Sequence, residues 1–190
     1  RYPGMQFLPK IIKILVANGV QKVLVVGRDF VAPTPAISHI IRKYKADGGF
    51  ILSASHNPAG INGDFGVKVE MDNGGQATES FTNALYEQTK VISSYKTLDI
   101  GDVDALELPN VEYVNPIKDY ADLLESMFDF DAIRKWFADG HTFRFDAMNA
   151  STGAAAHEIF VNRLGAKPEW ILRANPMDDF GAGVKMQEAK

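Results

Sequence analysis

Short apolar segments in alternation with amphipathic ones are the feature that most constrains the fold of this chain. Residues 22–27, "KVLVVG", form a continuous apolar run, which is typical of a strand buried on both faces. Amphipathic segments of helical period lie at 5–18, 34–49 and 78–95. Further apolar runs, expected as strands, lie at 50–54 and 66–70. Strand and helix in alternation predict an α/β fold, here a three-layer α/β/α domain with a mixed sheet.

The second expected helix has recognisable signals at both ends. Thr34 is expected as its N-cap, with Pro35 at the first helical position, where the missing N–H of proline does no harm. Gly48-Gly49 is expected to end it, because glycine readily adopts the left-handed backbone that follows a helix. These signals support the alternation of strand and helix that points to an α/β layered domain.

A domain boundary is predicted near Asn115-Pro116, where a second strand-and-helix pattern begins. The segments around it are an acidic irregular stretch at 97–109, an extended segment at 111–114, a long helix or a helix pair broken near Phe128–Phe130 at 115–140, a strand at 142–148 and a helix at 149–166. Residues 1–115 then form the first α/β domain. Residues 116–190 form the beginning of a second similar domain, since about 75 residues are too few to complete it.

Charge and composition disfavour several classes of protein. The formal net charge of −4 disfavours nucleic-acid binding, which needs a basic surface. The chain has no cysteine, and hence neither a disulfide framework nor a cysteine zinc site. No apolar run approaches the ~20 residues that span a bilayer, and the first residues, "RYPGMQFLPK", lack the apolar core of a signal peptide. A cytoplasmic protein without an integral membrane segment is therefore expected.

A polar loop rich in hydrogen-bond donors separates the apolar runs at 50–54 and 66–70. It places Ser55 just past the end of an expected strand, where open α/β sheets usually bind ligands. The side chains and backbone N–H groups that could cradle an anion belong to Ser53, Ser55, His56, Asn57, Gly60, Asn62 and Gly63. The loop also fits a plain polar turn, since Asn-Pro and Asn-Gly are strong turn formers.

Ser55 and Lys68 are the reactive groups that this region could offer. A serine hydroxyl needs an adjacent base or an already activated state, but consecutive side chains usually point apart, so no dyad of Ser55 with His56 is expected. Lys68 alternates with valines and is expected to point away from their face. It could bind phosphate as a point charge or act as an acid or base, and it fits a solvated strand lysine equally well.

Other polar groups fit ordinary surface or loop positions as well as binding sites. Arg28 and Asp29 precede a helix N-terminus, which attracts anions, but they also fit a plain β–α loop. Two acidic pairs could in principle ligate Mg²⁺ or be solvated; they are Asp129 with Asp131, and Asp178 with Asp179.

The serine loop and its surroundings resemble the α-D-phosphohexomutases, specifically their phosphoglucomutase branch. The stretch "SASHNPAGINGDFGVKVE" is similar to the family pattern Thr-Ala-Ser-His-Asn-Pro-Gly-Gly followed by Asn-Gly-Asp-Phe-Gly-Ile-Lys. Other similar stretches are "PTPAISHIIRKYKADGGFIL", "DNGGQATESF", "MFDFDAIRKWF", "FRFDAMNASTG" and "DDFGAG". The resemblance covers most of residues 5–183.

This resemblance implies an enzyme that interconverts glucose 1-phosphate and glucose 6-phosphate. Ser55 would carry a phosphoryl group, pass it to the sugar phosphate to form glucose 1,6-bisphosphate, and take one back. His56 would position the phosphate or handle a proton, Asn57 would help to bind the phosphate, and Lys68 would be an acid/base or charge-stabilising group. Mg²⁺ would bridge the phosphoserine at Ser55, with its remaining ligands outside this chain, and glucose 1,6-bisphosphate would be the activator.

Parts of the family pattern are missing from this sequence. Its metal loop Asp-Gly-Asp-Gly-Asp-Arg, its N-terminal Gly-Thr-Ser-Gly-Leu-Arg segment and its later sugar-specificity and phosphate-binding domains are absent. Ser53 and Ala59 replace a Thr and a Gly of the motif, and residues 184–190 leave the pattern. We therefore expect part of a longer protein, inactive alone and completed by further domains.

Two other functions stay open at this stage. Some family members, the parafusins, are phosphoproteins linked to calcium-regulated exocytosis and to vesicle association. A mutase for another sugar phosphate is the second alternative, since the sugar-reading loop lies outside this sequence.

Overall fold

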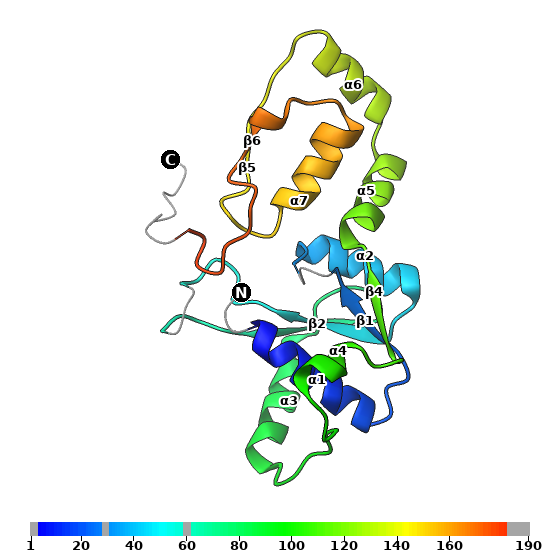
Figure 1. Ribbon diagram of the computed structural model, residues 1–190, viewed down its shortest axis with the longest axis vertical. Coiled ribbons are helices and arrows are strands. Elements are labelled where there is room, and N and C mark those ends of the chain that lie inside the picture. The colour runs from blue at the N-terminus through cyan, green and yellow to red at the C-terminus, as the bar shows by residue number, and fades with distance from the viewer. Residues whose placement is uncertain (1–3, 28–30, 59–61, 182–190) are drawn as a thin grey trace.

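The chain is built from helices and short strands in alternation, which confirms the predicted α/β class (Figure 1). The computed structural model describes residues 4–27, 31–58 and 62–181. The helices are α1 (Gly4–Ala17), α2 (Thr34–Tyr44), α3 (Glu79–Val91), α4 (Asp102–Leu106), α5 (Pro116–Met127), α6 (Phe130–Ala138), α7 (Gly153–Ala156), the π-helix η1 (His157–Arg163) and the 3-10 helix η2 (Pro168–Trp170). The strands are β1 (Val23–Val26), β2 (Gly48–Leu52), β3 (Val67–Met71), β4 (Val111–Val114), β5 (Phe145–Asp146) and β6 (Ile171–Leu172).

The strands pair in both directions, although in separate small sheets rather than within one mixed sheet. β1 pairs in parallel with β4, and β5 pairs in parallel with β6. β2 and β3 form an antiparallel hairpin, in which Gly48 lies opposite Met71 and Leu52 opposite Val67. Within the part of the chain that the structure describes, these pairs make three two-stranded sheets. The hairpin is the element that carries the serine loop.

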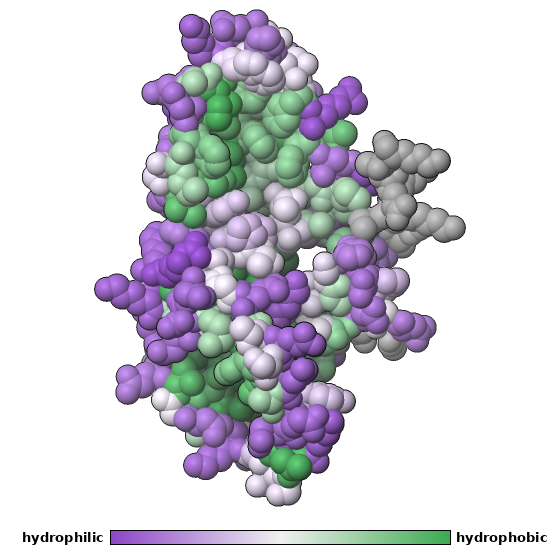
Figure 2. Space-filling model, turned by 180° about the vertical axis from the view of Figure 1, so that it is seen from behind, coloured by the Kyte–Doolittle hydropathy of each residue, from purple (hydrophilic) through white to green (hydrophobic). Residues whose placement is uncertain are grey.

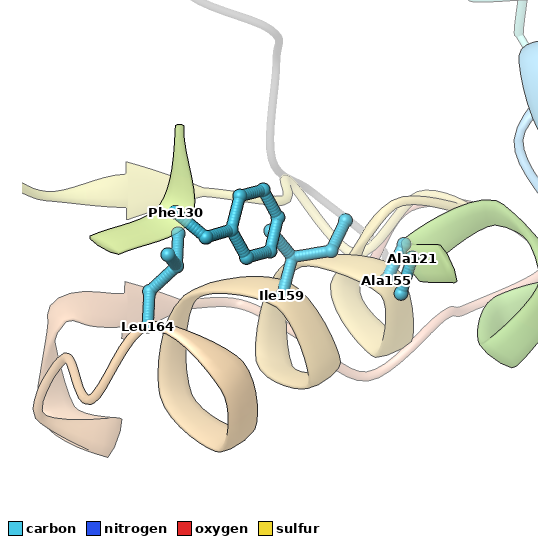
Figure 3. Close-up of a cluster of buried hydrophobic side chains, with 5 residues drawn as sticks. All are labelled: Ala121, Phe130, Ala155, Ile159 and Leu164. Atoms are coloured by element: carbon cyan, nitrogen blue, oxygen red, sulfur yellow. The ribbon is translucent and has the colours of Figure 1, made fainter. Parts of the chain in front are cut away.

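Two groups of elements are visible in Figure 1, with α5 between them. One contains α1 to α4 with β1 to β4, and the other contains α6, α7, β5 and β6. A buried core shared by α5 and the second group consists of Ala121, Phe130, Ala155, Ile159 and Leu164 (Figure 3). The predicted limit near Asn115-Pro116 falls between β4 and α5, and as a domain boundary it stays a prediction.

Apolar surface remains exposed on the first group. On the rear face, hydrophobic residues gather in the upper and lower parts of the molecule, with hydrophilic residues around the middle (Figure 2). Helix α3 contributes no buried residue, and its Phe81, Leu85 and Tyr86 are exposed. No helix of the described residues is both long and apolar enough to cross a membrane.

The ends of α2 differ from the sequence prediction. Pro33 is the cap residue and Thr34 is already helical, without any side-chain cap bond, so the prediction of Thr34 as N-cap is wrong. The extended backbone of Pro33, with ψ 147°, supplies the entry geometry one residue earlier. The helix ends at Lys45, whose φ of 54° is left-handed, and Gly48-Gly49 instead begins β2.

The region after α3 contains more structure than its composition suggested. The short helix α4 forms inside the stretch predicted to be irregular. The helix pair is broken at Phe128, and Asp129 caps α6 by accepting a hydrogen bond from the N–H of Ala132. The strand expected at 142–148 is limited to β5, and after it the chain turns at Met148 and Asn149, which have positive φ. Neither η2 nor β6 was predicted.

Candidate active site

The serine loop is held at both ends by ordered neighbours. It continues the pairing of β2 with β3, because the N–H of Ser53 donates to the carbonyl of Gly66 at 2.9 Å. The adjacent Phe65 ring stacks on Phe7 of α1, with the ring centroids 5.2 Å apart. The hairpin and α1 therefore set where the loop can present its side chains.

Ser55 has a left-handed backbone, with φ 57°. Its N–H donates to Oγ of Ser53 at 3.0 Å, and its own Oγ lies 3.2 Å from Nδ1 of His56. The expectation that Ser55 and His56 would point apart is therefore wrong, since the left-handed residue breaks the alternation of side chains. Non-glycine residues adopt this conformation at a cost of about 1–3 kcal/mol and often do so at functional sites.

A hydrogen bond between the side chains of Asn57 and Asp64 connects the two ends of the serine loop. Nδ2 of Asn57 donates to Oδ2 of Asp64 at 3.0 Å, and the N–H of Asp64 donates to the carbonyl of Pro58 at 2.9 Å. Ser53 and Asn57, expected to face an anion, thus also hold the loop in shape. Sequence reasoning did not single out Asp64, although its place in the Asn-Gly-Asp-Phe-Gly stretch was a usable signal.

Lys68 lies on β3 opposite Ile51, near the end of the hairpin from which the loop leaves. Its side chain is half-buried. Val67, which lies on the other face of β3, is exposed. The structure therefore places Lys68 beside the loop, on a strand that is hydrogen-bonded to the strand leading into it.

Glu70 is a residue of this face that sequence reasoning missed. It is 2% exposed, and its Oε1 has no hydrogen-bond partner within the described ranges. Burial raises the pKa of the Glu70 carboxyl, while the positive charge of Lys68 lowers it. The two-residue period of the strand could have identified Glu70, since it shares the face of Lys68.

The remaining candidates take part in local structure. Asp129 caps α6, and Asp131 accepts a hydrogen bond from Arg134 at 2.6 Å. Asp179 accepts one from the N–H of Gly181. Arg28 and Asp29, together with the N–H of Gly60, lie outside the described residues.

The described residues do not form a complete magnesium site. Nowhere in ranges 4–27, 31–58 and 62–181 do three or more His, Asp or Glu side chains come together in a way that could hold a metal ion. Ser55 offers a single oxygen. The residues that the structure describes therefore do not match the oxygen-rich coordination that Mg²⁺ requires.

A half-open cavity of about 640 Å³ lies elsewhere, at the carboxyl ends of β1 and β4. Its walls include Tyr113 and Asn115 from the first group of elements and Ser151 and Ala154 from the second. Ser55 is not among its lining residues.

Comparison with known proteins places these features in a family context. Residues 1–96 match the family model described as "Phosphoglucomutase/phosphomannomutase, alpha/beta/alpha domain I". Among similar curated proteins, a phosphoglucomutase from Rhizobium radiobacter is 45% identical over 188 residues, covering 95% of this chain and 34% of the relative. A chloroplastic phosphoglucomutase 1 from Marchantia polymorpha is 46% identical over 191 residues, covering 96% of this chain and 29% of the relative.

A solved structure confirms the similarity in three dimensions. The open form of the exocytosis-sensitive phosphoprotein pp63/parafusin, a phosphoglucomutase from Paramecium, superposes with a TM-score of 0.87 at 35% identity. The match covers 95% of this chain and 36% of that one. The chain thus spans about a third of the length of the relatives it matches.

Proposed function

The chain belongs to the phosphoglucomutase/phosphomannomutase family, and from this premise we propose that it is the phosphoserine-bearing part of a phosphoglucomutase. The observation that carries the proposal is the geometry of Ser55. Its hydroxyl lies at hydrogen-bond distance from Nδ1 of His56, on a strained loop residue at the end of the β2–β3 hairpin. The relatives named as phosphoglucomutases support the same reaction.

In the proposed reaction, Ser55 carries the phosphoryl group between sugar phosphates. The P–O bond to Ser55 Oγ breaks as a hydroxyl oxygen of glucose 1-phosphate bonds to phosphorus, which forms glucose 1,6-bisphosphate and returns a proton to Oγ. Transfer of the other phosphoryl group back to Ser55 releases glucose 6-phosphate. Such transfer depends mainly on positioning and on charge stabilisation.

The neighbouring residues have separate proposed roles. His56 is close enough to Ser55 Oγ to hold the proton that the hydroxyl gains and loses. Asn57 keeps the loop in shape through Asp64 and helps to bind phosphate. Lys68 supplies a positive charge from the neighbouring strand, as phosphate binding requires.

We propose Mg²⁺ as the cofactor and glucose 1,6-bisphosphate as the activator only because the chain belongs to this family. When bound, Mg²⁺ would neutralise charge on the transferring phosphoryl group, with ligands contributed from outside this chain. The described residues do not complete a magnesium site. The 190-residue chain by itself is accordingly expected to be inactive, and turnover by it in a coupled assay would contradict this.

Phosphopeptide mapping tests the proposal directly. The complete protein is incubated with glucose 1,6-bisphosphate labelled in its phosphoryl groups, then digested and analysed. We expect label on Ser55, none in Ser55→Ala, and unchanged labelling in Ser126→Ala, a serine of α5 whose hydroxyl donates to a backbone carbonyl. Label on any other residue would overturn the site assignment.

Two alternatives are tested with the same variants. The likeness to pp63/parafusin favours a role in exocytosis as the second candidate, in which vesicle association persists in Ser55→Ala. A different sugar specificity would appear as a higher kcat/KM for mannose 1-phosphate than for glucose 1-phosphate.

The cellular setting and the domain division belong to the proposal as well. We place the protein in the cytoplasm, with sugar phosphates as its small-molecule partners and no nucleic acid; the names of relatives include both cytoplasmic and chloroplastic proteins. We also propose residues 1–115 and 116–190 as two domains, the second continued by further parts of the protein.

A further inference from the structure

Three Asn-Gly pairs occur in this chain, at Asn18-Gly19, Asn62-Gly63 and Asn73-Gly74. In such a pair the backbone nitrogen of the glycine can attack the side-chain amide carbon of the asparagine, because glycine has no side chain to obstruct the approach. The attack requires the asparagine side chain to rotate onto the next peptide group. The three pairs should therefore react at rates that depend on how firmly each side chain is held.

Hydrogen bonds hold two of these side chains. Nδ2 of Asn18 donates to the carbonyl of Ile14 at 2.8 Å and to that of Lys96 at 3.2 Å. Oδ1 of Asn73 accepts a hydrogen bond from the N–H of Gly75 at 2.8 Å. Both amides must leave these bonds before the neighbouring nitrogen can attack them.

The side chain of Asn62, in the serine loop, is exposed. Within the described ranges 31–58 and 62–181, no hydrogen bond holds it. Asn57, the other asparagine of the loop, precedes a proline, which has no N–H and cannot carry out the attack. Asn62 is therefore the asparagine of this loop that can react.

We propose that Asn62 is a site of spontaneous deamidation within the serine loop. The nitrogen of Gly63 bonds to Cγ of Asn62 and loses its proton, the C–N bond of the side-chain amide breaks, and ammonia leaves with that proton. A succinimide ring remains. Addition of a water molecule to either carbonyl of the ring opens it and gives aspartate or isoaspartate at position 62.

Either product changes the loop that carries Ser55. Each adds a negative charge to a loop whose proposed ligand is an anion, so phosphate binding should weaken. Isoaspartate also inserts an extra carbon into the backbone close to Asp64, which accepts a hydrogen bond from Asn57 at 3.0 Å. Mutase activity should therefore fall as Asn62 converts. This consequence rests on the proposed function, whereas the modification itself does not.

Ageing of the complete protein in heavy-oxygen water at mildly alkaline pH, followed by peptide mapping, tests the proposal. Heavy oxygen marks each carboxyl group formed during ageing, and cleavage after lysine places the three pairs in separate peptides, at 14–22, 46–68 and 69–90. We expect Asn62 to convert at least about fivefold faster than Asn18 and Asn73, the rate equivalent of about 1 kcal/mol for one hydrogen bond that must break.

The same measurement in concentrated urea separates the fold from the sequence. Without a fold to hold any side chain, the three rates should become equal. Conversion of Asn18 or Asn73 as fast as Asn62 in the folded protein would overturn the proposal. A lead of Asn62 that persists unchanged in urea would overturn it too, because the lead would then come from neighbouring residues alone.

Activity links the modification to the serine loop. Wild type should lose activity at the rate at which Asn62 converts, whereas Asn62→Gln, whose longer side chain closes a ring more slowly, should keep its own starting activity. Asn18→Gln is the matched control outside the loop and should lose activity as wild type does. Equal losses in Asn62→Gln and wild type would overturn the effect on the loop. Absence of mutase activity before ageing would instead overturn the proposed function and leave the peptide comparison standing.

Discussion

Lys43 and Asp119 form an ion pair between α2 and α5, with Nζ and Oδ1 2.6 Å apart although 76 residues separate them in sequence. The hydroxyl of Tyr44 donates to Oδ2 of the same carboxylate at 3.0 Å. Asp119 is buried, whereas Lys43 is more exposed. One carboxylate thus joins the helix that precedes β2 to the first helix after β4.

Replacement of Asp119 by alanine should lower the free energy of unfolding by about 1–2 kcal/mol, because it removes a charged acceptor from two donors. Tyr44→Phe removes only one bond and should have about half that effect. Urea unfolding at pH 7 measures both. Equal stability of Asp119→Ala and wild type would show that the link contributes nothing.

On the alkaline side, deprotonation of Lys43 should weaken the same link. The hydrogen bond to Asp119 raises the pKa of Lys43 above its usual 10.5. The folded state therefore holds this proton more tightly, so the contribution is fully present below pH 10.5 and is lost as the pH rises through the folded-state pKa. Stability curves of wild type and Asp119→Ala should converge there.

Substitution of Ser55 by glycine should stabilise the fold while it removes the proposed phosphoryl acceptor. Glycine adopts the left-handed backbone without a steric penalty, and we expect a gain of about 0.5–1 kcal/mol. Lys45→Gly, outside the loop, is the matched control for this backbone effect, because the φ of Lys45 is 54° and that of Ser55 is 57°. Ser55→Ala keeps the strain and should give no gain; a gain as large as that of Ser55→Gly would contradict this reason.

Glu70→Gln should be more stable than wild type at pH 7, by about 1 kcal/mol, because a buried carboxylate without a partner is replaced by a neutral amide. Burial raises the folded-state pKa of Glu70 above 4.5, so the wild type loses stability as the pH rises from 4.5 through that pKa. The advantage of Glu70→Gln should therefore vanish below pH 4.5. Glu107→Gln, at an exposed position, is the control variant.

Arg163→Met should lower the urea midpoint at neutral pH, because Arg163 binds Asp122, Glu125 and Glu158 at 2.7, 2.9 and 3.0 Å. Hydrogen bonds from Lys118 and Arg163 lower the pKa of Asp122 from 3.8 to about 2. The contribution of the Asp122 carboxylate to the free energy of unfolding is therefore present above pH 3.8 and lost as the pH falls through about 2. The two proteins should converge in acid, and Lys90→Met, at a surface pair with Glu87, should differ little from wild type at any pH.

The element order and the place of the serine loop were readable from the sequence. Apolar runs with a two-residue or 3.6-residue period predicted β1 to β4, α1 and α3 because these periods reflect local geometry. The residues around Ser55 also form a contiguous motif, so its position at the end of β2 needed no knowledge of distant contacts. Element ends were less predictable, as Thr34 and Lys45 show, because several neighbouring residues can take the cap conformation.

The sequence by itself thus determined the fold class, the family and the candidate serine. Only the tertiary structure decided that Ser55 meets His56 and that Glu70 is buried beside Lys68. The first depends on a left-handed residue that no period reveals. The second depends on how α2 packs on the β2–β3 hairpin, and a two-residue alternation defines two faces without saying which one α2 will contact.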